Sequence, residues 1–343
     1  MIPIENIYYL LCYAWDKLDE KEKVSVTIDS ETNLLDLLAK VLINGSKRLL
    51  KKGIAQNYMT YTNEMKGVKG KIEIAHSLKT NLFQKKMTCC SYDDLSSDIL
   101  LNQILVSTLN NLTRTKDLDK GLKADLIKVQ RMFVGIERIK INKKHFKSLQ
   151  ISRNQHFYSF LMNVCELIHL SSLPDEKEGN FLFMNFSQDE RKMNQLFEAF
   201  VRNFYKFEMK DIFQTGRETI LWQFGTPKES NRKYLPQMQT DITLENANKK
   251  IIIDAKYYKE TMALNYDKEK IHSSHLYQLN SYLLHQQSSD PKTKCATGIL
   301  LYPTIEEEFD LHFTYEEHNI FIKTINLNTH WSHISKRLKE IVL

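Results

Sequence analysis

A short apolar run that ends in charged residues is the feature that most constrains the fold of this chain. Residues 251–253 are three consecutive isoleucines, followed directly by Asp254, Ala255 and Lys256. Isoleucine favours strands, and successive side chains of a strand point to opposite faces. Asp254 and Lys256 should therefore share one face, while Ala255 points into the core. The sequence predicts a central strand whose end presents an acid and a lysine to a common site.

A polar loop before this strand sets the expected register of a β-hairpin. Residues 245–250 read ENANKK, and a symmetric antiparallel turn centred on them places Asp241 opposite Asp254, with Cβ atoms roughly 4.5–5.5 Å apart. Two carboxylates at this separation repel each other unless a cation lies between them. The small side chain of Ala255 leaves its backbone carbonyl accessible as a further oxygen ligand. Oxygen ligands of this kind suit Mg²⁺.

The predicted site fits metal-dependent hydrolysis of a phosphodiester. A bound Mg²⁺ would polarise a phosphoryl oxygen, lower the pKa of a bound water and offset charge on the leaving oxygen. Lys256 would position the water or stabilise developing charge, because an ordinary lysine pKa of about 10.4 makes a poor base at neutral pH. The alternative is a solvated strand face without function, since D-x-K sequences are common. The opposed Asp241 and the apolar lead-in favour a site.

Length and composition fit a globular protein of two domains without disulfides. The 343 residues exceed what one compact domain usually needs, and 42% of them are hydrophobic. The net charge of +6 permits contact with nucleic acid without requiring it. An odd number of cysteines, five, without C-x-x-C spacing predicts a reduced protein without a zinc site. The first residues show neither a signal-peptide nor a membrane-span pattern, so we expect a cytoplasmic protein without membrane contact.

The predicted elements of the C-terminal half indicate a mixed sheet flanked by helices. They are a strand over 181–186, a helix over 189–209, a strand over 219–224, the hairpin, a helix over 273–287 and a strand over 296–303. This order of helices and strands is typical of an α+β or α/β fold.

The N-terminal half mixes helices and strands. Its expected elements are helices over 4–18, 33–52, 95–113, 121–136 and 155–171, and strands within 54–75 joined by a glycine-containing turn. The loop at 171–180, rich in Ser, Pro, Asp, Lys and Gly, is the clearest break between periodic segments. A boundary before the preceding helix gives an N-terminal domain of residues 1–154 and a C-terminal domain of residues 155–343.

Several sequence blocks together cover most of the chain. In order they are IPIENIYYLLCYAW, GVKGKIEI, YDDLSSDILLNQIL, MNQLFEAFVRNFY, LPQMQTDITLENANKKIIIDAKYYK and HLYQLNSYLL. In this order they resemble McrC, the family of nuclease subunits of McrBC-type modification-dependent restriction systems. The resemblance implies a PD-(D/E)XK endonuclease fold for residues 155–343, with Mg²⁺-dependent cleavage of DNA.

The resemblance also implies roles for individual residues of the hairpin. Asp241 matches the first acid of the motif, Asp254 the second acid and Lys256 the lysine. Asp241, Asp254 and the carbonyl of Ala255 are then the expected metal ligands. Thr240 stands where the motif usually has a proline, a departure that weakens the match at this position.

Two helices are expected to add further site residues. Glu198 matches an acidic position that completes the metal shell in many members of the superfamily; its alternative role is a solvated helix flank. Gln278 and Tyr282 match a Q-x-x-x-Y pattern and share one helical face, where they would contact DNA phosphate or the active-site lysine, or simply pack. His272 and His275 are expected to cap, pack or contact phosphate rather than to bind metal.

The chain lacks a P-loop motif, so we expect it to hydrolyse no nucleotide itself. The resemblance implies an AAA+ GTPase partner, an McrB-like hexameric ring that binds GTP and reads modified cytosine in double-stranded DNA. Residues 1–154 would dock on this ring and stimulate its GTPase. Two alternatives stay open: a stand-alone PD-(D/E)XK repair or recombination nuclease, and a catalytically silent adaptor that activates the GTPase.

Overall fold

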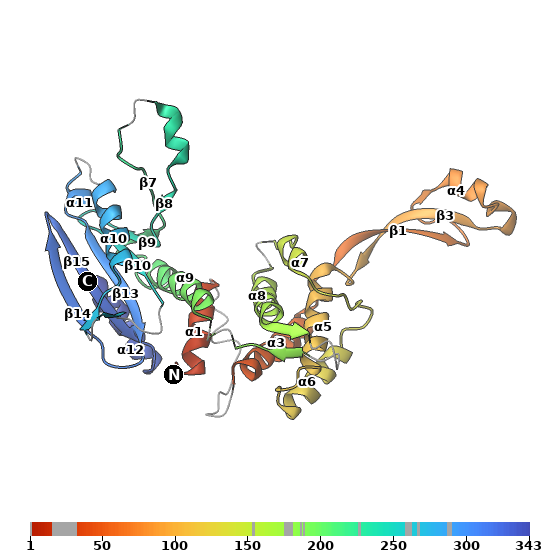
Figure 1. Ribbon diagram of the computed structural model, residues 1–343. Coiled ribbons are helices and arrows are strands. Elements are labelled where there is room, and N and C mark those ends of the chain that lie inside the picture. Colours follow the sequence, from red (N-terminus) through yellow and green to blue (C-terminus); the bar gives the residue numbers. More distant parts are fainter. Residues whose placement is uncertain are drawn as a thin grey trace. The chain divides into compact units, whose positions relative to one another are not determined.

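A computed structural model of the chain shows two compact units (Figure 1). We name them the sheet unit, Met1–Asn33 with Asn185–Leu343, and the arm unit, Leu34–Met184. The structure describes residues 2–15, 33–152, 155–174, 181–185, 187, 189–225, 228–257, 263–265, 268–286 and 290–343.

The sheet unit contains a six-stranded mixed sheet with helices packed against it. Its elements are α1 (Ile4–Ala14), α9 (Glu190–Glu208), β6 (Gln214–Gly216), β7 (Thr219–Ile220), η4 (Glu229–Tyr234), β8 (Met238–Gln239), β9 (Ile242–Glu245), β10 (Lys250–Ala255), β11 (Ala263–Asn265), β12 (Lys268–Lys270), α10 (Ser273–Gln286), α11 (Pro291–Lys294), β13 (Thr297–Thr304), β14 (Asp310–Tyr315), β15 (His318–Asn326) and α12 (Trp331–Val342). The strand order is β14-β15-β13-β10-β9-β6. The three central strands β15, β13 and β10 run parallel, and the other neighbours pair antiparallel. The predicted mixed sheet flanked by helices is confirmed.

The strand that carries the three isoleucines lies inside this sheet, as the sequence predicts. Ile252 packs in one cluster with Leu279 and Leu283 of α10 and Leu300 of β13. The alternate residues of β10, which point to the other face, are also buried. Burial on both faces is typical of a central strand with parallel pairing, and it explains why the run is apolar at every position.

Two predicted strands of the C-terminal half are wrong in extent and place. Of the expected strand 181–186, only Phe181–Phe183 forms a strand, and it pairs with Ser172–Pro174 in the arm unit rather than joining the central sheet. Only Thr219–Ile220 of the expected strand 219–224 is extended into a ladder, and it pairs with β8 outside the central sheet. The edge position beside β9 is taken by β6 instead. The sheet also continues through β15 and β14, which follow the last predicted strand.

The arm unit combines packed helices with a long β-arm. Its elements are α3 (Leu34–Lys52), β1 (Asn57–Met65), β2 (Lys71–Ile72), α4 (Ile74–Lys79), η1 (Phe83–Lys85), β3 (Thr88–Ser96), α5 (Leu100–Thr113), α6 (Lys120–Arg131), α7 (Lys143–Lys147), α8 (His156–Ser171), β4 (Ser172–Pro174) and β5 (Phe181–Phe183). Helices α3, α5, α6 and α8 pack on one another. Figure 1 shows β1 and β3 projecting from these helices, with α4 near the far end. We call residues 57–96 the β-arm.

The arm corrects the expected strand pairing within residues 54–75. The two strands there do form, but both pair with β3 rather than with each other, in the order β1-β3-β2. The ladder between β1 and β3 runs without interruption from Asn57↔Ser96 to Met65↔Thr88. β3 reads TCCSYDDLS, which lacks the alternation of apolar and polar residues that would have predicted it.

The division into units differs from the boundary expected after residue 154. Helix α8 packs on α3 and α5 and so belongs with the arm unit. Helix α1 packs on α9, where the Tyr13 ring lies 5.7 Å from the Phe200 ring and 5.4 Å from the Phe204 ring. The aromatic face of α1 therefore joins the first residues of the chain to the sheet unit. Among the described helices, none is both long and apolar enough to cross a bilayer.

Candidate active site

The hairpin of β9 and β10 has the predicted register. Ile251 pairs with Leu244 and Ile253 with Ile242, so the next residues outward on the two strands are Asp254 and Asp241. Residues that directly face each other in an antiparallel pair share one face of the sheet. The symmetric turn therefore positions both acids at the same end of the hairpin.

The structure brings Asp241, Asp254 and Lys256 together. Lys256 Nζ donates a hydrogen bond to Asp254 Oδ1 at 3.0 Å, and it lies 3.7 Å from Asp241 Oδ2. The Asp254 side chain is fully buried, whereas those of Lys256 and Asp241 are 13% and 17% exposed. The site therefore has one buried carboxylate at its base, with the second acid and the amine nearer to solvent.

The pKa values of Asp254 and Lys256 are both shifted by their surroundings. Burial raises the pKa of Asp254 to about 7; the nearby Asp241 adds to the rise, while Lys256 opposes it. Burial lowers the pKa of Lys256, but the two carboxylates outweigh burial and the net shift is upward. Lys256 is therefore protonated at neutral pH, and its charge partly neutralises the acids.

Two buried carboxylate oxygens of the site have no hydrogen-bond donor in the described part of the chain. They are Asp241 Oδ2 and Asp254 Oδ2. A buried acceptor without a partner costs about 1–3 kcal/mol, and more when the group is charged. A divalent cation would satisfy both oxygens and offset the repulsion between the acids. The donor set thus fits Mg²⁺, which takes few protein carboxylates and keeps several waters.

The carbonyl of Ala255 is oriented toward the same side. The N–H of Lys256 donates to Leu301 O of β13 at 3.0 Å. All peptide bonds of the described chain are trans, and in a trans peptide the N–H and C=O point in opposite directions. The Ala255 carbonyl therefore points away from β13, toward the side of β10 where β9 and Asp241 lie. This direction agrees with its predicted role as an oxygen ligand.

Glu198 lies near the site but is engaged by two arginines. Its Oε1 accepts a hydrogen bond from Arg202 Nη1 at 3.2 Å and another from Arg217. Arg202 Nη1 also lies 3.5 Å from the backbone oxygen of Asp241. Within the described ranges, no three His, Cys, Asp or Glu side chains form a cluster that could hold a metal ion. Glu198 is thus connected to Asp241 through Arg202 rather than grouped with the two aspartates.

The two arginines were not predicted as part of the site. The i,i+4 spacing of Glu198 and Arg202 on one helix is a recognisable pattern for an ion pair. Arg217 precedes β7 and meets Glu198 only through the tertiary fold. No local pattern in the sequence could have indicated that contact.

Gln278 and Tyr282 meet on one face of α10, as their spacing predicts. Gln278 Nε2 donates to the Tyr282 hydroxyl at 2.7 Å, and this hydroxyl donates to Gln239 O at 2.8 Å. Gln239 lies two residues before Asp241. Burial raises the pKa of Tyr282, and the hydrogen bond from Gln278 opposes the rise. The pair therefore anchors the strand that leads into the first acid.

Thr240, at the position where a proline was expected, holds the backbone before Asp241. Its N–H donates to Glu218 O at 2.9 Å, and its Oγ1 accepts from Glu218 N at 2.9 Å. Its hydroxyl also lies 2.9 Å from that of Thr243. A proline has no N–H and could not make the first contact. In this chain the backbone before Asp241 is held by the hydrogen bonds of Thr240, whereas a proline would restrict it through its ring.

The histidines at the start of α10 are packed near the site. The His275 ring is buried, and its Nδ1 lies 2.8 Å from the Tyr302 hydroxyl. Burial lowers the pKa of His275 to about 4, and the charge of Lys256 adds to the effect. The His272 ring lies 5.0 Å from that of His275. His275 is therefore a neutral packing residue at physiological pH.

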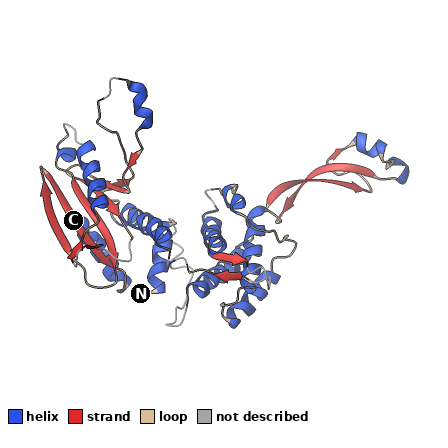
Figure 2. Ribbon diagram, in the orientation of Figure 1, coloured by secondary structure: helices blue, strands red, loops and turns tan. Residues whose placement is uncertain are grey.

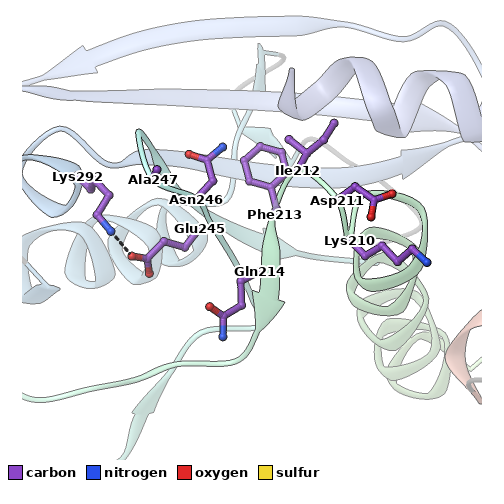
Figure 3. Close-up of a pocket in the computed structure, with 9 residues that line it drawn as sticks. All are labelled: Lys210, Asp211, Ile212, Phe213, Gln214, Glu245, Asn246, Ala247 and Lys292. Atoms are coloured by element: carbon purple, nitrogen blue, oxygen red, sulfur yellow. Dashed lines mark hydrogen bonds and ion pairs between the residues drawn. The ribbon is translucent and has the colours of Figure 1, made fainter.

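A separate hollow of about 440 Å³ lies at the opposite, turn end of the hairpin (Figure 3). It is lined by residues 210–214, which run from just after α9 into β6, by residues 245–247 at the end of β9 and in the following turn, and by Lys292 of α11. Two of its charged side chains are joined, since Lys292 Nζ donates to Glu245 Oε1 at 2.6 Å. None of the predicted site residues lines it, so the carboxylate cluster and this hollow are distinct.

The fold and the site define an α+β protein in which two carboxylates and a lysine meet at the end of a hairpin in a mixed sheet. The chain belongs to the family described as McrBC 5-methylcytosine restriction system component, which matches residues 5–303. The family resemblance expected from the sequence is confirmed.

A curated relative agrees with this assignment, and a solved structure shares the fold. The chain is 31% identical over 341 residues to an Escherichia coli K12 protein described as "Type IV methyl-directed restriction enzyme EcoKMcrBC", covering 99% of this chain and 97% of that one. The fold of the present chain is similar to that of a chain in an assembly of Thermococcus gammatolerans McrB AAA+ hexamers with bound McrC. That similarity has a TM-score of 0.58 at 16% identity and covers 99% of this chain and 76% of the other.

Proposed function

We propose that this chain is the Mg²⁺-dependent endonuclease subunit of an McrBC-like restriction complex, with a PD-(D/E)XK active site that hydrolyses phosphodiester bonds of DNA. The observation that carries the proposal is the convergence of Asp241, Asp254 and Lys256, with two buried carboxylate oxygens that lack a donor. Membership in a restriction-system family supports DNA as the substrate.

In the proposed site, Asp241, Asp254 and the Ala255 carbonyl would hold the ion. When bound, Mg²⁺ would supply Lewis-acid polarisation of a phosphoryl oxygen and a more acidic water. Lys256 keeps its proton because the two acids raise its pKa. It therefore orients the attacking water by hydrogen bonding and stabilises negative charge that develops on the phosphoryl group. A general-base role for Lys256 would require a depressed pKa, which the carboxylates oppose.

Glu198 is better suited to positioning than to direct coordination. It was predicted to complete the metal shell, but Arg202 and Arg217 occupy its carboxylate. Through Arg202 it supports the backbone of Asp241. We propose that Glu198 fixes the first acid and that Arg217, whose side chain is 42% exposed, faces the substrate side of this network.

We further propose that the chain works in the cytoplasm with an McrB-like AAA+ GTPase ring, which would bind GTP and recognise modified cytosine in double-stranded DNA. The structurally similar assembly contains McrB hexamers with bound McrC. In this chain the β-arm offers a docking surface, because it exposes many large apolar side chains. These are Tyr58, Met59, Tyr61, Val68, Ile74, Leu78, Phe83 and Leu95. Exposed apolar side chains gathered on one projecting element are typical of a protein-interaction site.

The experiment that tests the proposal is plasmid cleavage by the reconstituted pair of this chain and its GTPase partner, with DNA carrying 5-methylcytosine, GTP and Mg²⁺. Asp254→Ala should abolish cutting yet still stimulate GTP hydrolysis, because the acid and the arm lie in different units. Cutting by the wild type without the partner would instead favour a stand-alone nuclease. GTPase stimulation without cutting by the wild type would favour the silent adaptor.

A further inference from the structure

A lobe, described here over residues 221–225 and 228–237, projects from the sheet unit between β7 and β8 (Figures 1 and 2). The helical turn η4 forms its outer part. Its base is fixed by the short ladder of β7 and β8, in which Ile220 pairs with Met238. Both residues are buried in the cluster that contains Tyr282 of α10. The lobe is thus a supported extension of the sheet unit.

Aromatic residues hold together the two chain segments at the base of the lobe, next to β7 and β8. Trp222 Nε1 donates to Pro236 O at 2.7 Å, which joins the outgoing and returning segments. The Trp222 ring stacks on Phe224 at 5.1 Å and meets the His285 ring of α10 at 4.9 Å. The N–H of Gln223 donates to His285 Nδ1 at 3.1 Å. These contacts give the lobe a defined position relative to α10.

The returning strand of the lobe leads directly into the proposed active site. β8 ends at Gln239, whose carbonyl accepts from the Tyr282 hydroxyl. Thr240 and Asp241 follow at once. A polymer held at the two acids would therefore extend along the lobe on at least one side of the bond to be cut.

The surface of the lobe combines exposed rings with basic side chains. Leu221 and Tyr234 are each 78% exposed, and Phe224 is 50% exposed. Arg232 and Lys233 stand exposed beside Tyr234, with Lys233 Nζ 5.0 Å from its ring centre. Cations suit phosphate oxygens, and apolar side chains placed among cations suit a groove, where they act as wedges or platforms.

We propose that the lobe holds duplex DNA beside the bond that is cut, with Arg232 and Lys233 on backbone phosphates and Tyr234 against a groove. This rests on the proposed nuclease function. Duplex DNA is favoured over a protein partner because the exposed rings are interleaved with cations and because the lobe is continuous with Asp241. The docking surface for the GTPase ring is proposed on the β-arm, so the lobe remains available to the substrate.

The test is binding of the full chain to a fluorescein-labelled duplex of roughly 20 base pairs, followed by fluorescence anisotropy in EDTA over a salt series. The double variant Arg232→Gln/Lys233→Gln should bind at least about tenfold more weakly and reduce the slope of log K against log salt by about 2, since each phosphate contact contributes about 0.9. Lys294→Gln/Lys336→Gln removes two exposed cations elsewhere in the sheet unit and should leave both quantities unchanged.

Tyr234→Ala separates the ring from the charges. It should weaken binding several-fold without changing the salt slope, because it removes no ionic contact. Arg232 Nη1 lies 3.5 Å from Trp222 O, so its substitution could disturb the base of the lobe. Lys233→Gln alone, at an exposed position, avoids this contact and should lower the slope by about 1.

Several results would overturn the inference. One is a wild-type salt slope in the double variant; another is an equal loss in the control pair. Loss of GTPase stimulation with normal DNA binding would make the lobe a protein-docking surface instead. Failure of the nuclease proposal looks different: the wild type would bind duplex through the lobe yet never cut it. If lobe variants bind normally while Asp254→Ala abolishes cutting, only the lobe inference fails.

Discussion

Replacing Asp254 with asparagine should change the pH dependence of stability by a calculable amount. Burial, aided by Asp241, raises the pKa of Asp254 from an ordinary 3.8 to about 7. Each pKa unit is worth about 1.36 kcal/mol, so an ionised Asp254 costs the metal-free folded protein about 4 kcal/mol above pH 7. Asparagine has nearly the same shape and no charge. The variant should therefore be more stable than the wild type in alkaline solution without Mg²⁺.

The sign follows from proton binding. Because the pKa is higher in the folded state, that state holds more protons between about pH 4 and 7, and stability falls as pH rises through this range. Below the unfolded pKa both states are protonated and the penalty disappears. Between about pH 5 and 8 the wild type should lose about 3 kcal/mol relative to Asp254→Asn.

Urea unfolding followed by tryptophan fluorescence in EDTA measures this difference. All three tryptophans, Trp15, Trp222 and Trp331, belong to the sheet unit, so the signal reports the unit that contains the site. Asp310→Asn is the matched control. Although burial raises the pKa of Asp310, hydrogen bonds from Arg337 lower it overall, so this acid stays ionised in both states across the range. A wild-type-minus-variant difference for Asp254→Asn that is constant with pH would refute the electrostatic account.

Three further substitutions test other parts of the structure. Lys256→Met should lower the rate of plasmid cleavage by about 10²–10³, as removal of one charge-stabilising donor does elsewhere; unchanged cleavage would exclude the lysine from the reaction. Tyr58→Ser/Leu95→Ser removes an exposed cross-strand pair of the β-arm and should reduce GTPase stimulation. Val134→Ser, in the arm unit but outside the β-arm and 83% exposed, should not. Thr240→Pro should destabilise the sheet unit by about 2–3 kcal/mol in urea unfolding through loss of its backbone donor; equal stability would show that those hydrogen bonds contribute little.

The hairpin was predictable from the sequence because local rules determine it. A symmetric polar turn at 245–250 fixes the register, and strand alternation fixes which side chains share a face. Together they place Asp241, Asp254 and Lys256 within a few ångströms before any tertiary contact is known. The same holds for Gln278 and Tyr282, since helical spacing alone makes them neighbours.

Contacts between distant segments were not predictable in this way. The pairing of β1 with β3 joins strands separated by a turn, a helix and a third short strand, and β3 has no apolar alternation. The packing of α1 on α9 depends on ring contacts across the sequence. Arg217 reaches Glu198 because β6, which ends at Gly216, packs against α9 in the folded unit. Each of these three contacts depends on how whole helices and strands pack in the folded unit. The spacing of residues within one element does not determine that packing.

The most direct test of the proposed site is a crystal structure of the protein soaked with Mn²⁺, a stand-in for Mg²⁺ that is identified by its anomalous scattering. The ion is expected between the carboxylates of Asp241 and Asp254, with the Ala255 carbonyl as a third protein ligand and Lys256 beside it. It should be absent from the same position in Asp254→Asn. A bound ion elsewhere in the sheet unit, with the two acids still joined only through Lys256, would contradict the proposed metal site and the nuclease mechanism built on it.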